Sequence, residues 1–343
     1  MLSRCPGYSG TVGSNPTLSA LIFMMKYLDD ILRAIGGTPL IRLRKVARNV
    51  KPPILAKAEF LNPGGSIKDR MALYILEKAE KEGKLKPGGT IVEATSGNTG
   101  VALAMYGAAR GYRVILTVIS KVSQEKLDHL KAFGAEVVVV PGDSLAERNR
   151  KAKEIADSIP ESFYVDQHDN MDNPNSHYYL TAPEIWDDTQ GRITHFVAGI
   201  GTGGTFTGVA RYLKEKNPEI RCIAVDPVGS VFYPYWKEGK ITKAVPYEIE
   251  GLGDEDIIPT VDFTLIDDMV QVDDREAFLM TRRLAREEGL FVGGSSGANV
   301  AAAIKVAQNL DDDAVVVTIL PDTGFKYLSK IFNDEWMREK GFL

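Results

Sequence analysis

The feature that most constrains the fold is the alternation of short β-rich runs with helical runs. Thr90–Glu93 and Glu136–Val140 are strand-length runs, and helical patterns lie between the strands of this series. A second series contains the strand-like runs His195–Gly199 and Ala314–Leu320. Strands that alternate with helices build parallel sheets covered by helices. The sequence therefore predicts an α/β protein with two such sheets and a changeover near residues 166–176.

Ligands of open α/β sheets bind at the carboxyl ends of the strands, so the loops that leave the strands are informative. The segment Gly64–Arg70 follows the extended run Ile54–Phe60 and opens a helical pattern over Ile67–Glu82. Ser66, followed three residues later by Asp69, predicts a helix N-cap with an acidic residue in the first turn.

Lys68 lies in the first turn of this predicted helix. The helix dipole disfavours a positive charge there by ~0.3–1 kcal/mol. The same field, together with desolvation, lowers the pKa of a lysine that must lose its proton to form an imine. Taken alone, the loop is explained more simply by an ordinary solvated lysine. The other loops must therefore decide whether Lys68 forms an imine.

The segment Thr95–Gly100 follows the strand Thr90–Glu93 and opens a second helical pattern. Free backbone N–H groups, two hydroxyls and an amide at a helix N-terminus make an anion site suited to a carboxylate. A plain capping loop explains this segment equally well when it is taken alone.

The segment Gly199–Thr205 follows another strand and opens the next helix. Its glycines let the backbone wrap around a phosphate, and the helix N-terminus neutralises the phosphate charge. A rival interpretation exists, because Gly199, Gly201 and Gly204 satisfy G-x-G-x-x-G and Asp226 ends the following strand. That pattern is the dinucleotide fingerprint of a nicotinamide or flavin oxidoreductase, but it does not account for the Lys68 loop.

A third small-residue helix start, Gly293–Gly297, opens the predicted helix Ala298–Gln308. It is compatible with another phosphate site or with a tight turn. A serine hydroxyl in this segment is also suited to hydrogen-bonding a neutral ring nitrogen.

Together these loops resemble the fold-type II pyridoxal-phosphate enzymes of the cysteine synthase and cystathionine β-synthase group. The resemblance runs from about Ile35 to Trp336 and is closest to the catalytic core of cystathionine β-synthase. It implies pyridoxal 5′-phosphate as the cofactor and two three-layer α/β/α domains with mostly parallel sheets, as in the tryptophan synthase β-like fold. The motifs that carry it are Asn62–Arg70, Thr95–Gly100, Gly201–Thr205, Gly293–Gly297 and Leu320–Asp322.

The resemblance also implies roles for individual residues. Lys68 is the Schiff-base lysine, Asn98 is the partner of the cofactor's phenolic oxygen, and Ser295 is the partner of its pyridine nitrogen. The residues implied to bind the cofactor phosphate are Gly201, Thr202, Gly203, Gly204 and Thr205. The residues implied to bind the substrate carboxylate are Thr95, Ser96, Gly97, Thr99 and Gln167. No metal site is expected.

The same resemblance predicts how the chain is divided into domains. A smaller, mobile substrate-binding domain comprises residues 26–39 and 62–171. A larger domain that binds the cofactor phosphate comprises residues 40–61 and 172–343. Residues 1–24 are predicted to be a disordered extension, because they are rich in Gly, Ser and Pro and lack a cleavage signal.

The activity implied is β-replacement on L-serine or an O-activated L-serine by a thiol or sulfide. The preferred pair is serine and homocysteine, which gives cystathionine, and the alternative is O-acetylserine and sulfide, which gives cysteine. The family usually has an aromatic residue at His168 and Tyr-Asp at the start of Asp254–Asp256. Both departures lie where the family recognises the second substrate. They put homocysteine in doubt and leave sulfide as an alternative second substrate. A cofactor-binding protein without turnover is a further alternative.

Composition excludes several other classes of protein. The 41 basic and 46 acidic residues give a net charge of −5, which argues against nucleic-acid binding. The longest apolar stretches are strand-sized, so no membrane partner is expected. Cys5 and Cys222 are the only cysteines, which excludes a disulfide framework. The expected partners are small-molecule substrates and a second copy of the chain in a homodimer, in the cytoplasm.

Overall fold

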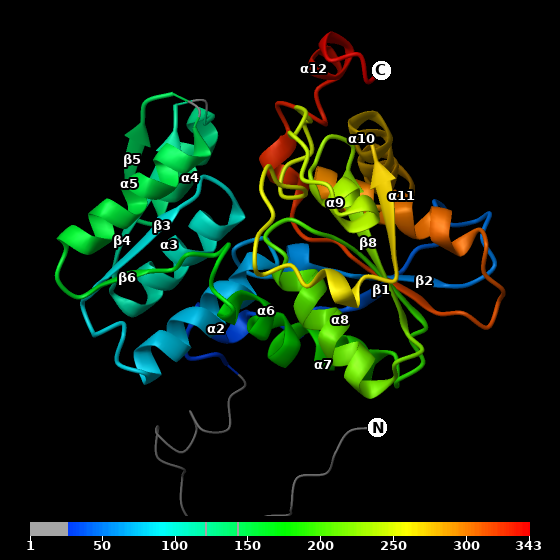
Figure 1. Cartoon of the computed structure of the whole chain (residues 1–343), viewed down its shortest axis with the longest axis horizontal. Helices are drawn as coiled ribbons and strands as arrows, with labels where there is room; N and C mark the ends of the chain where they lie inside the picture. The colour runs from blue at the N-terminus through cyan, green and yellow to red at the C-terminus, as the bar shows by residue number, and fades with distance from the viewer. Residues whose placement is uncertain (1–26, 121, 143) are drawn as a thin grey trace, which may run out of the picture.

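The computed structural model describes residues 27–120, 122–142 and 144–343. Two mostly parallel sheets, each covered by helices, form two α/β/α units that lie side by side (Figure 1). This arrangement confirms the predicted fold class. The predicted extension over residues 1–24 lies outside the described residues. Among the described residues, no helix has the length and apolar character that a membrane crossing requires.

The four-stranded sheet has the strand order β5-β4-β3-β6, and all of its pairs are parallel. Alternate residues of β3 enter different cores, because Ile91 packs with the α2 and α3 side and Val92 with α5. The strands are β3 (Thr90–Ala94), β4 (Arg113–Ile119), β5 (Glu136–Val140) and β6 (Ser162–Tyr164). The helices are α2 (Lys68–Lys81), α3 (Asn98–Arg110), α4 (Gln124–Ala132) and α5 (Leu145–Ser158).

The six-stranded sheet has the order β1-β2-β10-β7-β8-β9, with only the edge pair β1–β2 antiparallel. Val197 packs toward α10 and α11, whereas Phe196 and Ala198 pack toward α7 and α8. The strands are β1 (Leu40–Arg42), β2 (Ile54–Lys57), β7 (His195–Gly199), β8 (Arg221–Pro227), β9 (Asp268–Val272) and β10 (Val316–Ile319). The α-helices are α6 (Asp172–Ser176), α7 (Ala182–Asp188), α8 (Gly204–Lys216), α9 (Phe232–Glu238), α10 (Asp274–Arg283), α11 (Gly294–Ala307) and α12 (Asp334–Glu339).

The strands of the two sheets lie in separate parts of the chain. The four-stranded sheet uses only residues within 62–171, and the six-stranded sheet uses only residues within 40–61 and 172–343. The exact domain boundaries stay a prediction. Short 3-10 turns complete the connections, at Ile31–Ala34, Glu59–Leu61, Phe263–Leu265 and Gly324–Tyr327.

Helix α6 begins at Asp172, and Pro174 fits its first turn, where the missing N–H removes no hydrogen bond. It continues through a π-helical turn, His177–Thr181, into α7. A second π-helical turn, Leu284–Glu288, extends α10.

The predicted cap of the Lys68 helix was wrong. The helix begins at Lys68 itself, and Ser66 forms a backbone bridge with Asp322. The Asp69 carboxylate does not support the cap but accepts the N–H of Gly64 at 2.6 Å. The segment just before α2 therefore connects this helix to the six-stranded unit, through the bridge between Ser66 and Asp322.

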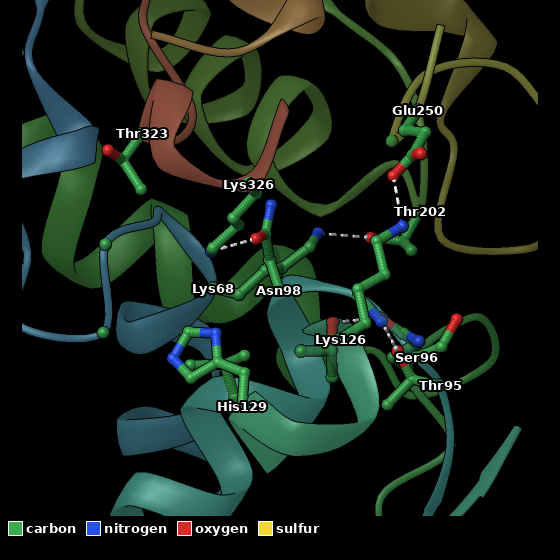
Figure 2. Close-up of a pocket in the computed structure, with 18 of the residues that line it drawn as sticks. Lys68, Thr95, Ser96, Asn98, Lys126, His129, Thr202, Glu250, Thr323 and Lys326 are labelled. Atoms are coloured by element: carbon green, nitrogen blue, oxygen red, sulfur yellow. Dashed lines mark hydrogen bonds and ion pairs between the residues drawn. The ribbon is translucent and has the colours of Figure 1, made fainter. Parts of the chain in front are cut away.

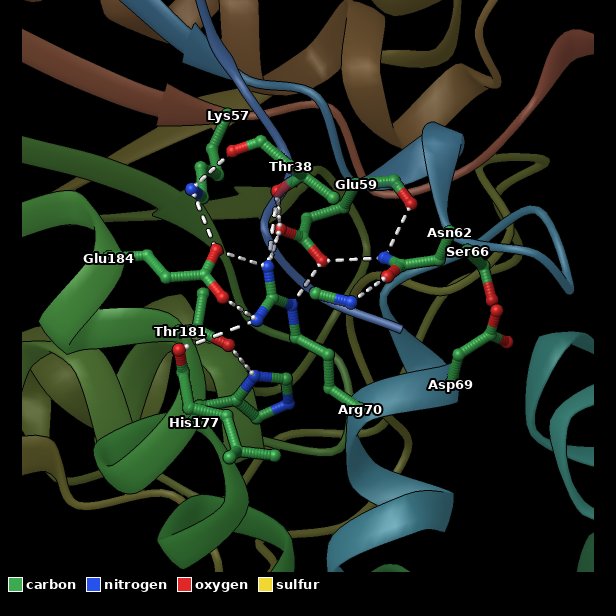
Figure 3. A network of polar contacts seen from close by, with 12 residues as sticks. Thr38, Lys57, Glu59, Asn62, Ser66, Asp69, Arg70, His177, Thr181 and Glu184 are labelled. Atoms are coloured by element: carbon green, nitrogen blue, oxygen red, sulfur yellow. Dashed lines mark hydrogen bonds and ion pairs between the residues drawn. The ribbon is translucent and has the colours of Figure 1, made fainter. Parts of the chain in front are cut away.

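A buried polar network anchors the same helix (Figure 3). The guanidinium of Arg70, which is almost completely buried, donates to both oxygens of Glu59 at 2.7 and 2.9 Å. It also donates to both oxygens of Glu184 in α7, each at 2.7 Å. Burial alone raises the Glu184 pKa, but hydrogen bonds from Arg70 outweigh it and hold that pKa at about 2. Lys57 adds a third cation, 2.9 Å from Glu184.

We expect Glu59→Gln to lower the free energy of unfolding by about 3 kcal/mol, because it leaves part of the buried Arg70 charge uncompensated. The matched control is Asp311→Asn, which breaks the exposed ion pair with Lys51 and should leave the free energy of unfolding nearly unchanged. Urea unfolding of the two variants measures both effects. Equal, small losses would show that the buried network does not stabilise this region.

Candidate active site

Two adjoining cavities lie at the carboxyl ends of the parallel strands. The larger has a volume of about 910 Å³ and the smaller about 60 Å³. Lys68, Asn98 and Thr202 line both cavities, so the two are continuous. The larger cavity is lined from both units, because the helices α3, α4 and α5 contribute one wall and the segment near Glu250 contributes another.

Lys68 is the first residue of α2, and its side chain lies where the cavities meet. Its Nζ donates to Thr202 Oγ1 at 3.1 Å (Figure 2). Burial lowers the pKa of Lys68 to about 8. A substantial fraction of this amine is therefore neutral near pH 8, which is the form required of a nucleophile or a base.

The segment Gly201–Thr205 forms a glycine cradle at the start of α8. Gly203 has a φ of +72°, a conformation that favours glycine. A Cβ at Gly204 would collide with the Asn173 side chain, and one at Gly201 would collide with the backbone of Gly251. The first turn of α8 presents N–H groups without helical partners, and this donor set fits a phosphate.

Ser295 is the second residue of α11, and it is buried against the smaller cavity opposite the glycine cradle. Two segments that are far apart in the sequence, Gly201–Thr205 and Ser295, therefore line the same space as Lys68. A hydroxyl at this point can donate to or accept from a ring nitrogen without adding charge.

Asn98 begins α3, and two residues of the other unit hold its amide. Asn98 Nδ2 donates to Asp322 Oδ2 at 2.9 Å. Lys326 donates to Asn98 Oδ1 (Figure 2). Burial raises the pKa of Asp322. Asp322 belongs to one of the motifs that carry the resemblance, but no role for Asp322 or Lys326 is predicted from the sequence.

The predicted carboxylate loop faces the larger cavity through Thr95, Ser96, Gly97 and Thr99. Thr99 Oγ1 donates to the buried Gln167 Oε1 at 2.6 Å. Asn173 then links this loop to the glycine cradle, because its Nδ2 donates to Gln167 O at 2.8 Å and to Thr202 Oγ1 at 3.0 Å. Asn173 has no distinctive sequence signal beyond the Asn-Pro pair that it begins.

One ion pair at the larger cavity joins the two units. Lys126 of α4 lies 2.6 Å from Glu250 (Figure 2). Lys330, which belongs to the same unit as Glu250, lies 2.8 Å from that carboxylate. The contact between Lys126 and Glu250 is visible only in the tertiary structure, because the two residues lie far apart in the sequence.

All thirteen residues predicted from the sequence line one or both cavities. The structure thus brings every predicted position together. Their individual roles remain to be proposed.

Comparison with known proteins identifies the family to which this chain belongs. The family model described as pyridoxal-phosphate dependent enzyme matches residues 31–322. The chain belongs to this family, whose cofactor is pyridoxal phosphate. The glycine cradle, the half-buried Lys68 and the neutral Ser295 fit that cofactor.

Within the family, the chain is similar to cystathionine β-synthases. It is 46% identical to that of Oryctolagus cuniculus, over 99% of this chain and 63% of the relative, and 45% identical to that of Apis mellifera, over 93% and 64%. The chain therefore spans less than two thirds of the length of these relatives. The solved O-acetylserine-dependent cystathionine β-synthase of Helicobacter pylori is similar with a TM-score of 0.82 and 42% identity, over 89% of this chain and 99% of that one.

We expect labelling of Lys68 in the cofactor-free protein by an amine-reactive reagent to rise with pH through a midpoint near 8, because burial favours the neutral amine. Lys51 is the control, since its hydrogen bond and ion pair with Asp311 raise its pKa above the ordinary value of ~10.4. Competitive labelling followed by mass spectrometry compares the two midpoints. Coincident midpoints would contradict the lowered pKa of Lys68.

Proposed function

We propose that this chain catalyses β-replacement on L-serine or an O-activated L-serine by a thiol or sulfide. The preferred reaction joins serine and homocysteine to give cystathionine and water. The observation that carries the proposal is the meeting of Lys68, the glycine cradle and the carboxylate-type loop at one cavity. The similarity to cystathionine β-synthases supports the same reaction.

The proposed roles follow the geometry of the cavities. The glycine cradle holds the cofactor phosphate, Ser295 the ring nitrogen and Asn98 the phenolic oxygen. When bound, pyridoxal phosphate supplies an electron sink for the bonds at the substrate Cα. The residues proposed to hold the substrate carboxylate are Thr95, Ser96, Gly97, Thr99 and Gln167, because they combine a helix N-terminus with hydroxyl and amide groups.

Lys68 is proposed to bind the cofactor and to move the substrate's Cα proton. Its lowered pKa allows the amine to accept that proton and later to return it. Thr202 Oγ1 accepts from Lys68 Nζ and so gives the amine a defined position when it is free. The β-substituent departs as water or carboxylate, and the incoming thiol loses its proton as the C–S bond forms.

Lys68→Ala should abolish turnover while leaving the fold intact, because among the described residues Lys68 is the only lysine that begins a helix at the cavity. Borohydride reduction of the wild-type holoprotein, followed by peptide mapping, should place the cofactor on Lys68 alone. Circular dichroism of the variant tests folding. Cofactor found on another lysine would refute the assignment.

Ser295→Asp should shift the reaction from β-replacement toward transamination, because an aspartate keeps the ring nitrogen protonated and strengthens the electron sink. Ser295→Ala is the matched control, since it removes the hydroxyl without adding charge. The ratio of keto-acid to thioether product measures the shift. An unchanged ratio in both variants would argue against contact with the ring nitrogen.

The substrate pair is tested by crossing serine, O-acetylserine and phosphoserine with sulfide and homocysteine. The similar enzyme of Helicobacter pylori depends on O-acetylserine, so the assay includes activated serines as first substrates. Cystathionine from homocysteine supports the preferred reaction, and cysteine from sulfide alone supports the alternative. Absence of any replacement product with every pair would overturn the proposal.

We further propose that the enzyme is a cytoplasmic homodimer. The family resemblance supports the dimer, and the lack of a disulfide framework in the sequence supports a reducing compartment. Light scattering of the purified protein and fractionation of the source cells test the two statements separately.

A further inference from the structure

The larger cavity carries several charged side chains besides Lys68, and most have partners. Among its cations, Lys126 pairs with Glu250, and Lys326 donates to Asn98. Arg148 is different. Its guanidinium donates to the neutral Asn149 side chain at 3.0 and 3.2 Å, and it forms no ion pair within the described part of the chain.

One cavity carboxylate is similarly available. Asp254 is largely enclosed, with 19% of its side chain exposed. Its Oδ1 accepts the N–H groups of Glu255 and Asp256 at 2.7 and 3.2 Å, which closes a turn. Its Oδ2 accepts no hydrogen bond among the described residues, and the nearest cationic candidate is His168 Nε2 at 3.9 Å.

The other cavity carboxylates are already engaged or exposed. Glu250 is shared by two lysines, and Glu125 and Asp128 lie on the exposed surface of α4. Glu93 lies close to Arg148, but burial raises the pKa of Glu93 to about 7, so it is only partly charged near neutrality. It does not form an ion pair with Arg148.

Arg148 and Asp254 belong to different units. Arg148 lies in the first turn of α5, whereas Asp254 follows the Glu250 segment of the other unit. Both line the larger cavity beside Gln167 and His168, outside the smaller cavity that contains Ser295. Opposite charges thus occur together in the larger cavity, on residues that have no role in the proposed cofactor site.

We propose that Arg148 and Asp254 form a dipolar subsite for the amino-acid end of the thiol nucleophile. Arg148 binds the carboxylate of that nucleophile, and Asp254 binds its ammonium group. A guanidinium presents a fork of donors that matches a carboxylate, and a carboxylate accepts from an ammonium group. The inference rests on the proposed β-replacement, and it selects an amino-acid thiol over sulfide.

His168 lies near both charges, since Asp254 and Arg148 each act electrostatically on its ring. Burial lowers the pKa of His168, so its ring is largely neutral above its ordinary titration range. An aromatic residue stands at this position in the resembled family, whereas here a neutral imidazole lies next to Asp254. The subsite is therefore built from positions at which this chain departs from the family pattern, together with Arg148.

The test crosses two variants with four nucleophiles. Arg148→Leu removes the carboxylate partner, and Asp254→Asn removes the ammonium partner while keeping the oxygen that closes the turn. The nucleophiles are homocysteine, mercaptobutanoate without the amine, aminopropanethiol without the carboxylate, and sulfide. Initial rates are measured for each holoenzyme with saturating first substrate.

Arg148→Leu should raise KM about tenfold or more for homocysteine and mercaptobutanoate, the two nucleophiles with a carboxylate. Asp254→Asn should raise KM by a similar factor for homocysteine and aminopropanethiol, the two nucleophiles with an ammonium group. Neither variant should raise KM for sulfide by a comparable factor. Arg150→Leu and Asp256→Asn are the matched controls, because both side chains are exposed and outside the cavity lining. Arg148→Lys should recover part of the lost affinity.

An equal loss with all four nucleophiles would overturn the inference, because it would indicate a role in joining the two units. Unchanged KM values in both variants would also overturn it. The cofactor's visible absorbance and thermal unfolding are recorded for each variant, so misfolding is separated from lost binding. If wild type forms no thioether or cysteine at all, the proposed function fails. If wild type uses homocysteine but the variants do not discriminate, only the subsite fails.

Discussion

The ion pairs of Arg70 with Glu59 and Glu184 fix the position on which the rest of the site depends. Arg70 lies two residues beyond Lys68 in α2, and both carboxylates belong to other segments. Because its guanidinium is held on two sides, the first turn of α2 has little freedom to rotate or shift. Buried ion pairs do not always increase stability over apolar packing, but they define geometry closely. Here that geometry places the reactive amine.

The smaller cavity is shaped by close approach of backbones. The absence of side chains at Gly201 and Gly204 allows the cradle to pack against Gly251 and Asn173. The same packing lets Asn173 connect the cradle with Gln167 on the substrate side. The glycine cradle and Gln167 are therefore joined through a single buried amide, although they belong to different units.

The larger cavity has a different character, because charges from both units meet there. The contacts Asn98–Asp322 and Lys126–Glu250 both cross between the units. A ligand that binds groups of both units favours the arrangement in which they are close. Arg148 and Asp254 are such groups, because they line the larger cavity from different units.

The sequence alone determined the fold class and the positions that line the site. Alternating strand and helix periods predict parallel sheets, and glycine-rich loops at strand ends reveal anion sites from local chemistry. Local patterns failed at Ser66, which forms a bridge with the distant Asp322, and at Asp69, whose carboxylate accepts the N–H of Gly64. Only the tertiary structure decided that Arg148 faces the same cavity as Asp254, and that Asp322 and Lys326 hold Asn98. Such pairings depend on how the two sheets are placed relative to each other, and local periodicity carries no information about contacts between residues so distant in sequence.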